Sequence, residues 1–96
     1  MVETHFIAIK TICINYGIDN SFVEELNEFG LIHIEFIEND RFIHQDQISD
    51  LEKMIRLRNE LNLNLEGIDV VFNLLQKEKE LKEELNMLRN RLKLYE

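Results

Sequence analysis

The sequence predicts a mostly α-helical protein in which a small domain, residues 1–64, is followed by one long C-terminal helix, residues 65–96. Apolar residues recur at helical spacing in four stretches, whereas only two stretches, within residues 4–9 and 31–43, alternate or are rich in β-branched residues. The chain has no proline, and each of its three glycines stands at the edge of a predicted helix, so no linker divides it. We therefore expect one compact unit with a modest core.

The N-terminal residues predict a short strand followed by a short helix. Residues 4–9 are rich in β-branched and aromatic types, which favour a strand. Helical spacing then relates four residues that form one apolar face, Ile9, Ile12, Cys13 and Tyr16. We expect Gly17 to follow the end of this helix in a left-handed conformation, and the thiol of Cys13 to face the core.

Residues 19–30 predict a second helix with an acidic outer face. Asp19 is a good N-cap residue, whose carboxylate can accept from backbone N–H groups of the first turn, and Gly30 is the residue type that ends helices. The apolar stripe is expected to consist of Phe22, Leu26 and Phe29. Three acids lie off this stripe and are expected to face outward: Glu24, Glu25 and Glu28.

The middle of the chain predicts a β-hairpin, or wing, and a third helix. Residues 31–37 alternate, residues 38–41 have turn chemistry, and residues 42–43 resume the strand pattern. We expect His33 to point outward from its strand. Asp46 is expected to cap a helix that ends at Leu61 and whose inner face carries Ile48, Leu51, Ile55 and the stem of Arg58.

The last helix is predicted to start after the N-cap Asn64, with Glu66 in its first turn, and to run to about Tyr95. Such a helix is about 46 Å long, more than a small domain can cover. Its far half carries an apolar seam at intervals of four and three residues, made by Leu81, Leu85, Leu88, Leu92 and Tyr95. This spacing is typical of coiled coils, so we predict a homodimer through this helix; its direction stays open.

The net charge of −8 is concentrated in the first 40 residues, which carry eight acids and Lys10 alone. Residues 41–96 carry eleven acids and ten bases and are nearly neutral. A field of this sign repels DNA phosphates and attracts a basic polypeptide. We therefore expect a protein partner and do not expect DNA binding. The candidate contacts are Glu24, Glu25, Glu28, Glu35, Glu38 and Asp40.

Enzymatic and metal-binding functions find little support in the sequence. The single cysteine, Cys13, cannot form an intrachain disulfide, and the three histidines show no ligand spacing with it. No Gly-rich phosphate loop, charged-then-apolar leader or 18-residue apolar run is visible. We expect a cytoplasmic, non-enzymatic protein without cofactor, metal, small-molecule ligand or membrane partner.

The order of these elements resembles the MerR-like winged helix-turn-helix superfamily, in which a helix-turn-helix and wing precede a long dimerising helix. A closer resemblance, to the chaperone modulator family CbpM, rests on residues 9–18, Ile-Lys-Thr-Ile-Cys-Ile-Asn-Tyr-Gly-Ile, and on residues 56–68, Arg-Leu-Arg-Asn-Glu-Leu-Asn-Leu-Asn-Leu-Glu-Gly-Ile. The leucines of residues 81–92 continue it. The resemblance implies binding to the J-domain of a DnaJ-like co-chaperone of the CbpA type, and inhibition of its co-chaperone and DNA-binding activity.

The alternative function is that of a MerR-type DNA-binding transcriptional regulator. DNA-reading members of that superfamily tend to place arginine on the second helix and in the wing. Here the matching helix carries Glu24 and Glu25, and the wing offers only Arg41. Two further arginines, Arg56 and Arg58, are explained equally by helix-surface charge and by partner contact.

Overall fold

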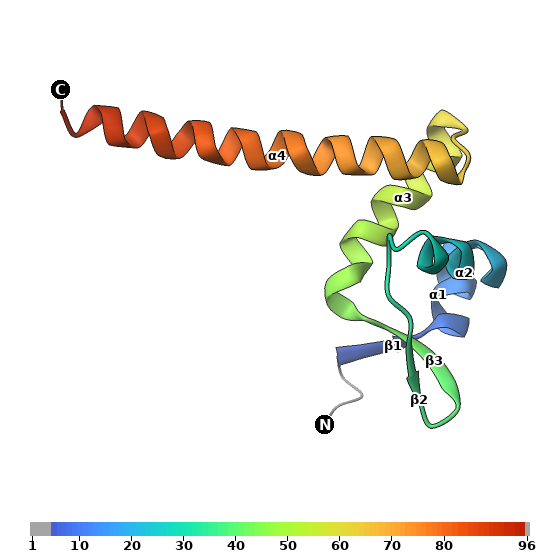
Figure 1. Ribbon diagram of the computed structural model, residues 1–96. Helices are drawn as coiled ribbons and strands as arrows, with labels where there is room; N and C mark the ends of the chain where they lie inside the picture. Colours follow the sequence, from blue (N-terminus) through green and yellow to red (C-terminus); the bar gives the residue numbers. More distant parts are fainter. Residues whose placement is uncertain (1–4, 96) are drawn as a thin grey trace.

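The computed structural model describes residues 5–95, which form a mostly helical domain with a small sheet and a long projecting helix (Figure 1). The predicted first strand, second helix and third helix are present with altered bounds, and Thr4 lies outside the described residues. The elements in chain order are β1 (Phe6–Ala8), α1 (Ile9–Tyr16), α2 (Asn20–Glu28), β2 (Glu35–Ile37), β3 (Asp40–His44), the 3-10 helix η2 (Gln45–Gln47), α3 (Ile48–Leu61) and α4 (Leu65–Lys93).

The predicted ends of α1 and α2 are largely confirmed. Gly17 follows α1 with φ +63°, and Gly30 follows α2 with φ +76°, the left-handed region that glycine adopts without steric cost. Asp19 occupies the N-cap position of α2, but its carboxylate makes no capping hydrogen bond. Its backbone carbonyl instead accepts from the N–H of Phe22, at 3.1 Å. The position of this cap was predicted correctly, and its side-chain role was wrong.

The core lies between α1, α2, α3, the sheet and the first turns of α4. Fourteen apolar residues are buried there, among them Phe22, Val23 and Leu26 of α2. The predicted apolar stripe of α2 was wrong at Phe29, which is 42% exposed. The reason is that the helix ends at Glu28, so Phe29 turns away from the stripe as the C-cap.

The sheet has three antiparallel strands in the order β1-β3-β2. Strand β1 pairs with β3 so that Ile7 lies opposite Ile43, an N-terminal contribution to the wing. Strands β2 and β3 are joined at Glu38 and Asn39, which both have positive φ, 49° and 65°. Two such residues form the type I′ turn whose twist matches a hairpin. The predicted wing is therefore present and extended by a third strand.

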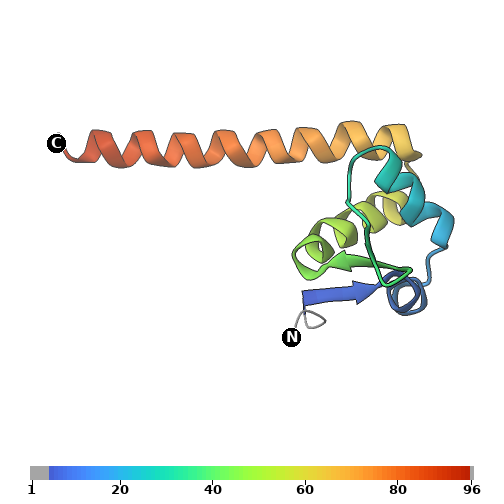
Figure 2. The ribbon, with the colours of Figure 1, turned by 60° about the horizontal axis from the view of Figure 1, so that its bottom comes forward.

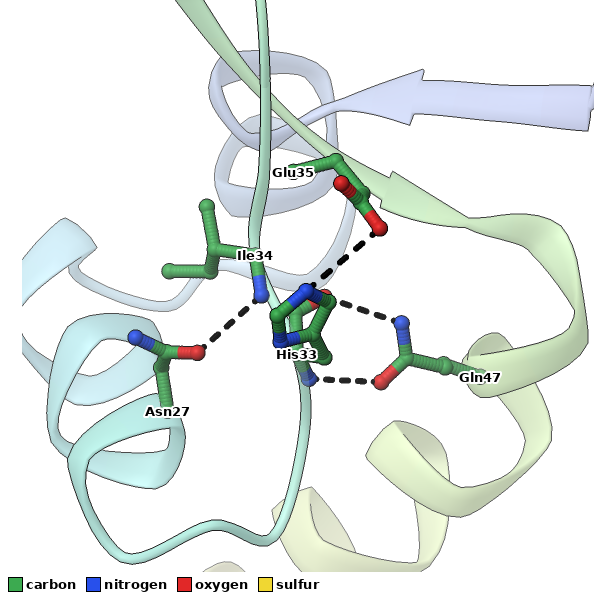
Figure 3. A network of polar contacts seen from close by, with 5 residues as sticks. All are labelled: Asn27, His33, Ile34, Glu35 and Gln47. Carbon is green, nitrogen blue, oxygen red and sulfur yellow. Dashed lines mark hydrogen bonds and ion pairs between the residues drawn. The ribbon is translucent and has the colours of Figure 1, made fainter.

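The first strand of the hairpin starts at Glu35, four residues later than predicted, because side-chain amides replace the strand ladder before it. The side chain of Gln47 accepts from the N–H of His33 at 2.7 Å and donates to the carbonyl of His33 at 2.9 Å (Figure 3). On the other side of this segment, Oδ1 of Asn27 accepts from the N–H of Ile34 at 3.0 Å. His33 does point outward, but from this irregular segment.

Helix α3 ends at Leu61 as predicted, but Asp46 does not cap it. Residues 45–47 form η2 instead, in which Nδ1 of His44 accepts from the N–H of Asp46 at 3.1 Å. The inner face of α3 carries the buried Leu51 and Ile55, as predicted, and also Met54.

Helix α4 starts at the predicted cap, since Oδ1 of Asn64 accepts from the N–H of Gly67 at 2.8 Å. Ile68 and Phe72, on the first turns of α4, are buried in the domain core. The rest of the helix projects away from every other element, as both views show (Figures 1 and 2). It ends at Lys93, slightly before the predicted end. None of the helices within residues 5–95 has the length and apolar character needed to cross a membrane.

Candidate protein-binding surface

The acids of α2 lie on the outer face of the helix that follows the turn after α1. Burial of Phe22, Val23 and Leu26 fixes the rotation of the helix, because residues three and four apart share a face. Glu24, Glu25 and Glu28 are consequently all exposed, as the sequence predicted. Glu24 and Glu28 are four residues apart and project from the same side.

An ion pair joins α2 to the wing. Nη1 of Arg41 on β3 contacts Oε1 of Glu24, and both side chains are partly exposed. The carboxylate of Asp40 in addition accepts from the backbone N–H of Arg41, at 2.8 Å. Arg41 is the only lysine or arginine between Lys10 and Lys53. The wing's one guanidinium is therefore engaged by an acid of α2.

Strand register shows which predicted acidic residues of the wing share the sheet face of Arg41. Residues that lie directly opposite each other in an antiparallel pair project from the same face of the sheet. Phe36 lies opposite Arg41, so both are on the face from which Arg41 reaches α2. Glu35 and Asp40 belong to the other face, and Glu38 is in the turn. Glu35 and Asp40 thus do not share the sheet face from which Arg41 reaches α2.

Sequence analysis missed an exposed aromatic residue, Phe36, which is 73% exposed. Alternation placed it with Ile32 and Ile34, and both of these isoleucines are buried. The hairpin, however, extends past the edge of the core before it reaches Phe36. One feature of the sequence could have indicated this exposure: Phe36 is close to the turn at Glu38, and the turn is the part of a hairpin that the rest of the protein covers least.

Arg58 is held by contacts within the chain. Its guanidinium carbon lies 4.0 Å from the centroid of the Phe22 ring, a cation–π contact that also covers this buried aromatic residue. Its Nε donates to the side chain of Asn59 at 3.4 Å. Arg56 is exposed beside Tyr16 and Glu52, and the hydroxyl of Tyr16 donates to the carboxylate of Glu52 at 2.7 Å. This hydrogen bond raises the pKa of Tyr16 above its ordinary value.

The thiol of Cys13 is a packing group at the edge of the core. Its side chain is partly buried, and its Sγ lies 3.3 Å from Oδ1 of Asn20. Burial raises the pKa of the Cys13 thiol, although the positive charge of Arg41 opposes the shift. A raised pKa lowers the fraction of the nucleophilic thiolate at neutral pH. Across residues 5–95, no group of three or more histidine, cysteine or acidic side chains could hold a metal ion.

The predicted seam of α4 lies on the projecting part of the helix. Its five residues are between 47% and 89% exposed: Leu81, Leu85, Leu88, Leu92 and Tyr95. Leu74, seven residues before Leu81, is 63% exposed and extends the seam toward the domain. Glu78 interrupts the seam, where its carboxylate forms an ion pair with Nζ of Lys82, one turn along the helix, at 3.9 Å. A shallow depression of about 350 Å³ lies along this part of the helix, from Leu74 to Leu85.

Comparison with known proteins agrees with this arrangement of helices and wing. The family model described as MerR HTH family regulatory protein matches residues 7–90, which run from β1 almost to the end of α4. No match is found among curated proteins. Helices α1 and α2 are then the helix-turn-helix, and β2 and β3 are the wing. The chain belongs to the MerR HTH family of regulatory proteins, with a winged helix-turn-helix followed by a long C-terminal helix.

Proposed function

We propose that this protein is an adaptor of the chaperone modulator type, which binds the J-domain of a DnaJ-like co-chaperone and inhibits it. Two observations support this proposal within the MerR family. The first is the resemblance of residues 9–18 and 56–68 to the CbpM family. The second is the charge of the helix-turn-helix and wing, which is opposite to the charge that binds DNA.

The observation that carries the proposal is the ion pair between Glu24 and Arg41. Most protein contacts that hold DNA go from cationic and polar groups to phosphate oxygens. On the described residues of α2 and the wing, the one cationic side chain of lysine or arginine type is engaged by an acid. The exposed Glu25 and Glu28 stand beside it and would repel a phosphate backbone.

The mechanism that follows is competition for a basic helix. J-domains present a basic helix to their chaperone partner, and an acidic face can occupy that helix by charge complementarity. A J-domain covered in this way cannot engage its chaperone. The adaptor needs no catalytic group for this action, because binding alone excludes the other partner.

We infer in addition that the protein is a homodimer through α4. Full burial of each seam leucine would stabilise the assembly by about 1.5–3 kcal/mol, and we expect the seam leucines together to offset the cost of ordering a projecting helix. A dimer would carry two copies of the acidic helix-turn-helix. Each copy could then bind one J-domain.

DNA binding is the second candidate function, favoured by membership of a family described as regulatory proteins. In that function Arg41 would have to leave Glu24 to reach a phosphate, and the acids of α2 would have to face the duplex. Both requirements oppose the electrostatic term that dominates binding to DNA.

Surface plasmon resonance across a salt series tests the adaptor function. The variant Glu25→Lys/Glu28→Lys reverses two acids and leaves the Glu24–Arg41 pair in place. We expect it to slow association with an immobilised J-domain by about tenfold at low salt and to flatten the salt dependence. The matched control, Glu83→Lys/Glu84→Lys, makes the same charge change on exposed positions of α4. Equal effects of the two variants, or no binding by the wild type, would contradict the proposal.

A further inference from the structure

We propose that Phe36 is the apolar anchor of the partner-binding surface, on which an apolar side chain of a cationic partner helix is buried. This inference rests on the proposed function, because the cationic helix is that of the bound J-domain. It adds an apolar residue, Phe36, to a binding surface that was otherwise identified by its charge. It also places the partner on one side of the wing.

The register of the hairpin places Phe36 on the sheet face from which Arg41 reaches α2. Phe36 and Arg41 are directly opposite each other, and Arg41 extends to Glu24 on α2. The phenyl ring therefore projects from the wing on the side of the helix-turn-helix. It remains 73% exposed, because it stands beyond the buried Ile43 on that face of the sheet.

Phe36 and the acids of α2 and the wing have the composition of a protein interface, with an apolar centre and a charged rim. Protein interfaces concentrate binding energy in a few aromatic or arginine residues, which are surrounded by polar groups that exclude water. The acids available for such a rim are Glu28, one turn along α2 from Glu24, and Glu38, two residues after Phe36 in the turn of the wing. A lone exposed phenylalanine is ordinary on a protein surface. Phe36 is distinguished by its sheet face, because it shares that face with Arg41, whose side chain reaches the acidic helix α2.

Charge complementarity selects a cationic polypeptide as the occupant. The first 40 residues carry a net charge of −7, from eight acids and one lysine, so the same surface of a second copy would be repelled. Duplex DNA is repelled for the same reason and gains nothing from a phenyl ring in place of a phosphate contact. A basic helix with one apolar side chain could pair its charges with the acids and bury its apolar side chain against the phenyl ring.

The anchor and the acids are expected to act on different rate constants. Charges at the rim set the association rate and its salt dependence, whereas a buried anchor sets the dissociation rate. Truncation of Phe36 should therefore speed dissociation and leave the salt dependence of association unchanged. A merely structural role for Phe36 would not produce this separation.

Binding of the full-length protein to an immobilised J-domain, measured by surface plasmon resonance, tests the inference. We expect Phe36→Ala to weaken Kd by about 30-fold, the lower bound for an interface hot spot, chiefly through faster dissociation. Phe36→Leu, which keeps an apolar side chain, should bind more tightly than Phe36→Ala. The matched control is Ile14→Ala, because Ile14 on α1 is 75% exposed and should leave Kd unchanged.

Three results would overturn the inference. An unchanged Kd for Phe36→Ala, with wild-type binding intact, would remove Phe36 as an anchor and leave the adaptor function standing. An effect confined to association and abolished by salt would assign Phe36 to the rim. Absence of wild-type binding would refute the adaptor function itself. Circular dichroism of each variant confirms that it is folded before binding is measured.

Discussion

Arg41 on the wing and Glu24 on α2 form an ion pair across the junction of the helix-turn-helix and the wing. The pair has two consequences. It ties the hairpin to the second helix, in addition to the hydrogen bond from the N–H of Ile34 to Asn27 of α2. It also leaves the surrounding acids, Glu25 and Glu28, without this guanidinium as a counter-charge.

The first prediction concerns the strength of this pair. Because both side chains are partly exposed, we expect a coupling free energy of about 0.2–1 kcal/mol that falls as salt is added. A double-mutant cycle of Glu24→Gln and Arg41→Gln, measured by urea unfolding at one fixed protein concentration, gives this value. A coupling free energy of zero at low salt would mean that the pair does not hold the wing.

The second prediction concerns Gln47, whose side chain makes two hydrogen bonds with the backbone of His33. Replacement by alanine removes both, so we expect Gln47→Ala to lower the free energy of unfolding by about 1–3 kcal/mol. Gln45→Ala, an exposed neighbour in η2, should change it by less than about 0.5 kcal/mol. Equal losses in the two variants would show that the amide of Gln47 is dispensable.

The parts of the fold that could be predicted from the sequence are those that depend on residues close together in the chain. Gly17 and Asn64 act within a few residues of their own positions, so the end of α1 and the start of α4 were predicted correctly. The start of β2 was not, because it depends on Asn27 and Gln47, which approach the chain from two different helical elements (Figure 3). The pairing of β1 with β3 is a contact of the same long-range kind.

The third prediction concerns the pH dependence of Tyr16, whose neutral hydroxyl donates to Glu52. This hydrogen bond raises the folded-state pKa of Tyr16, so its contribution to stability is present below the unfolded-state pKa and is lost as pH rises through the folded-state pKa. We expect the stability difference between the wild type and Tyr16→Phe to narrow above pH 10 or so. Thermal unfolding of both proteins over a pH series measures it.

Ultraviolet titration of the tyrosinate checks the cause of the shift. In a Tyr95→Phe background, the remaining tyrosine is Tyr16, because the chain has only two. We expect Glu52→Gln to move its titration midpoint to lower pH, since both the carboxylate acceptor and its negative charge are removed. A midpoint that does not move would exclude Glu52 as the cause.

The fourth prediction concerns dimerisation through the seam of α4. Leu88→Lys places a charge within the seam, so we expect this variant to be monomeric in sedimentation velocity and the wild type at the same concentration to be a dimer. Met87→Lys is the matched control, because Met87 is as exposed as Leu88 but lies off the seam. If Leu88→Lys is still a dimer, or if Met87→Lys loses the dimer equally, the protein does not dimerise through this seam.

The charge of the candidate site could be predicted from the sequence, but its geometry could not. Composition alone placed the acids in the first 40 residues, and helical spacing placed Glu24, Glu25 and Glu28 outside. The partner of Glu24 could not be read from the sequence, because Arg41 is 17 residues away and reaches it through the hairpin. The exposure of Phe36 likewise depends on how far the wing extends beyond the core.

One paired measurement on the full-length protein at physiological salt tests the central claim most directly. The protein is titrated with a J-domain, and in parallel it is used to select sequences from a random pool of duplex DNA. The claim is that the acidic helix-turn-helix and wing bind a cationic polypeptide in place of DNA. We predict saturable binding of the J-domain, weakened by Glu25→Lys/Glu28→Lys, and no enrichment of any DNA sequence after repeated selection. Selection of a defined DNA sequence, together with no binding of the J-domain, would contradict the claim.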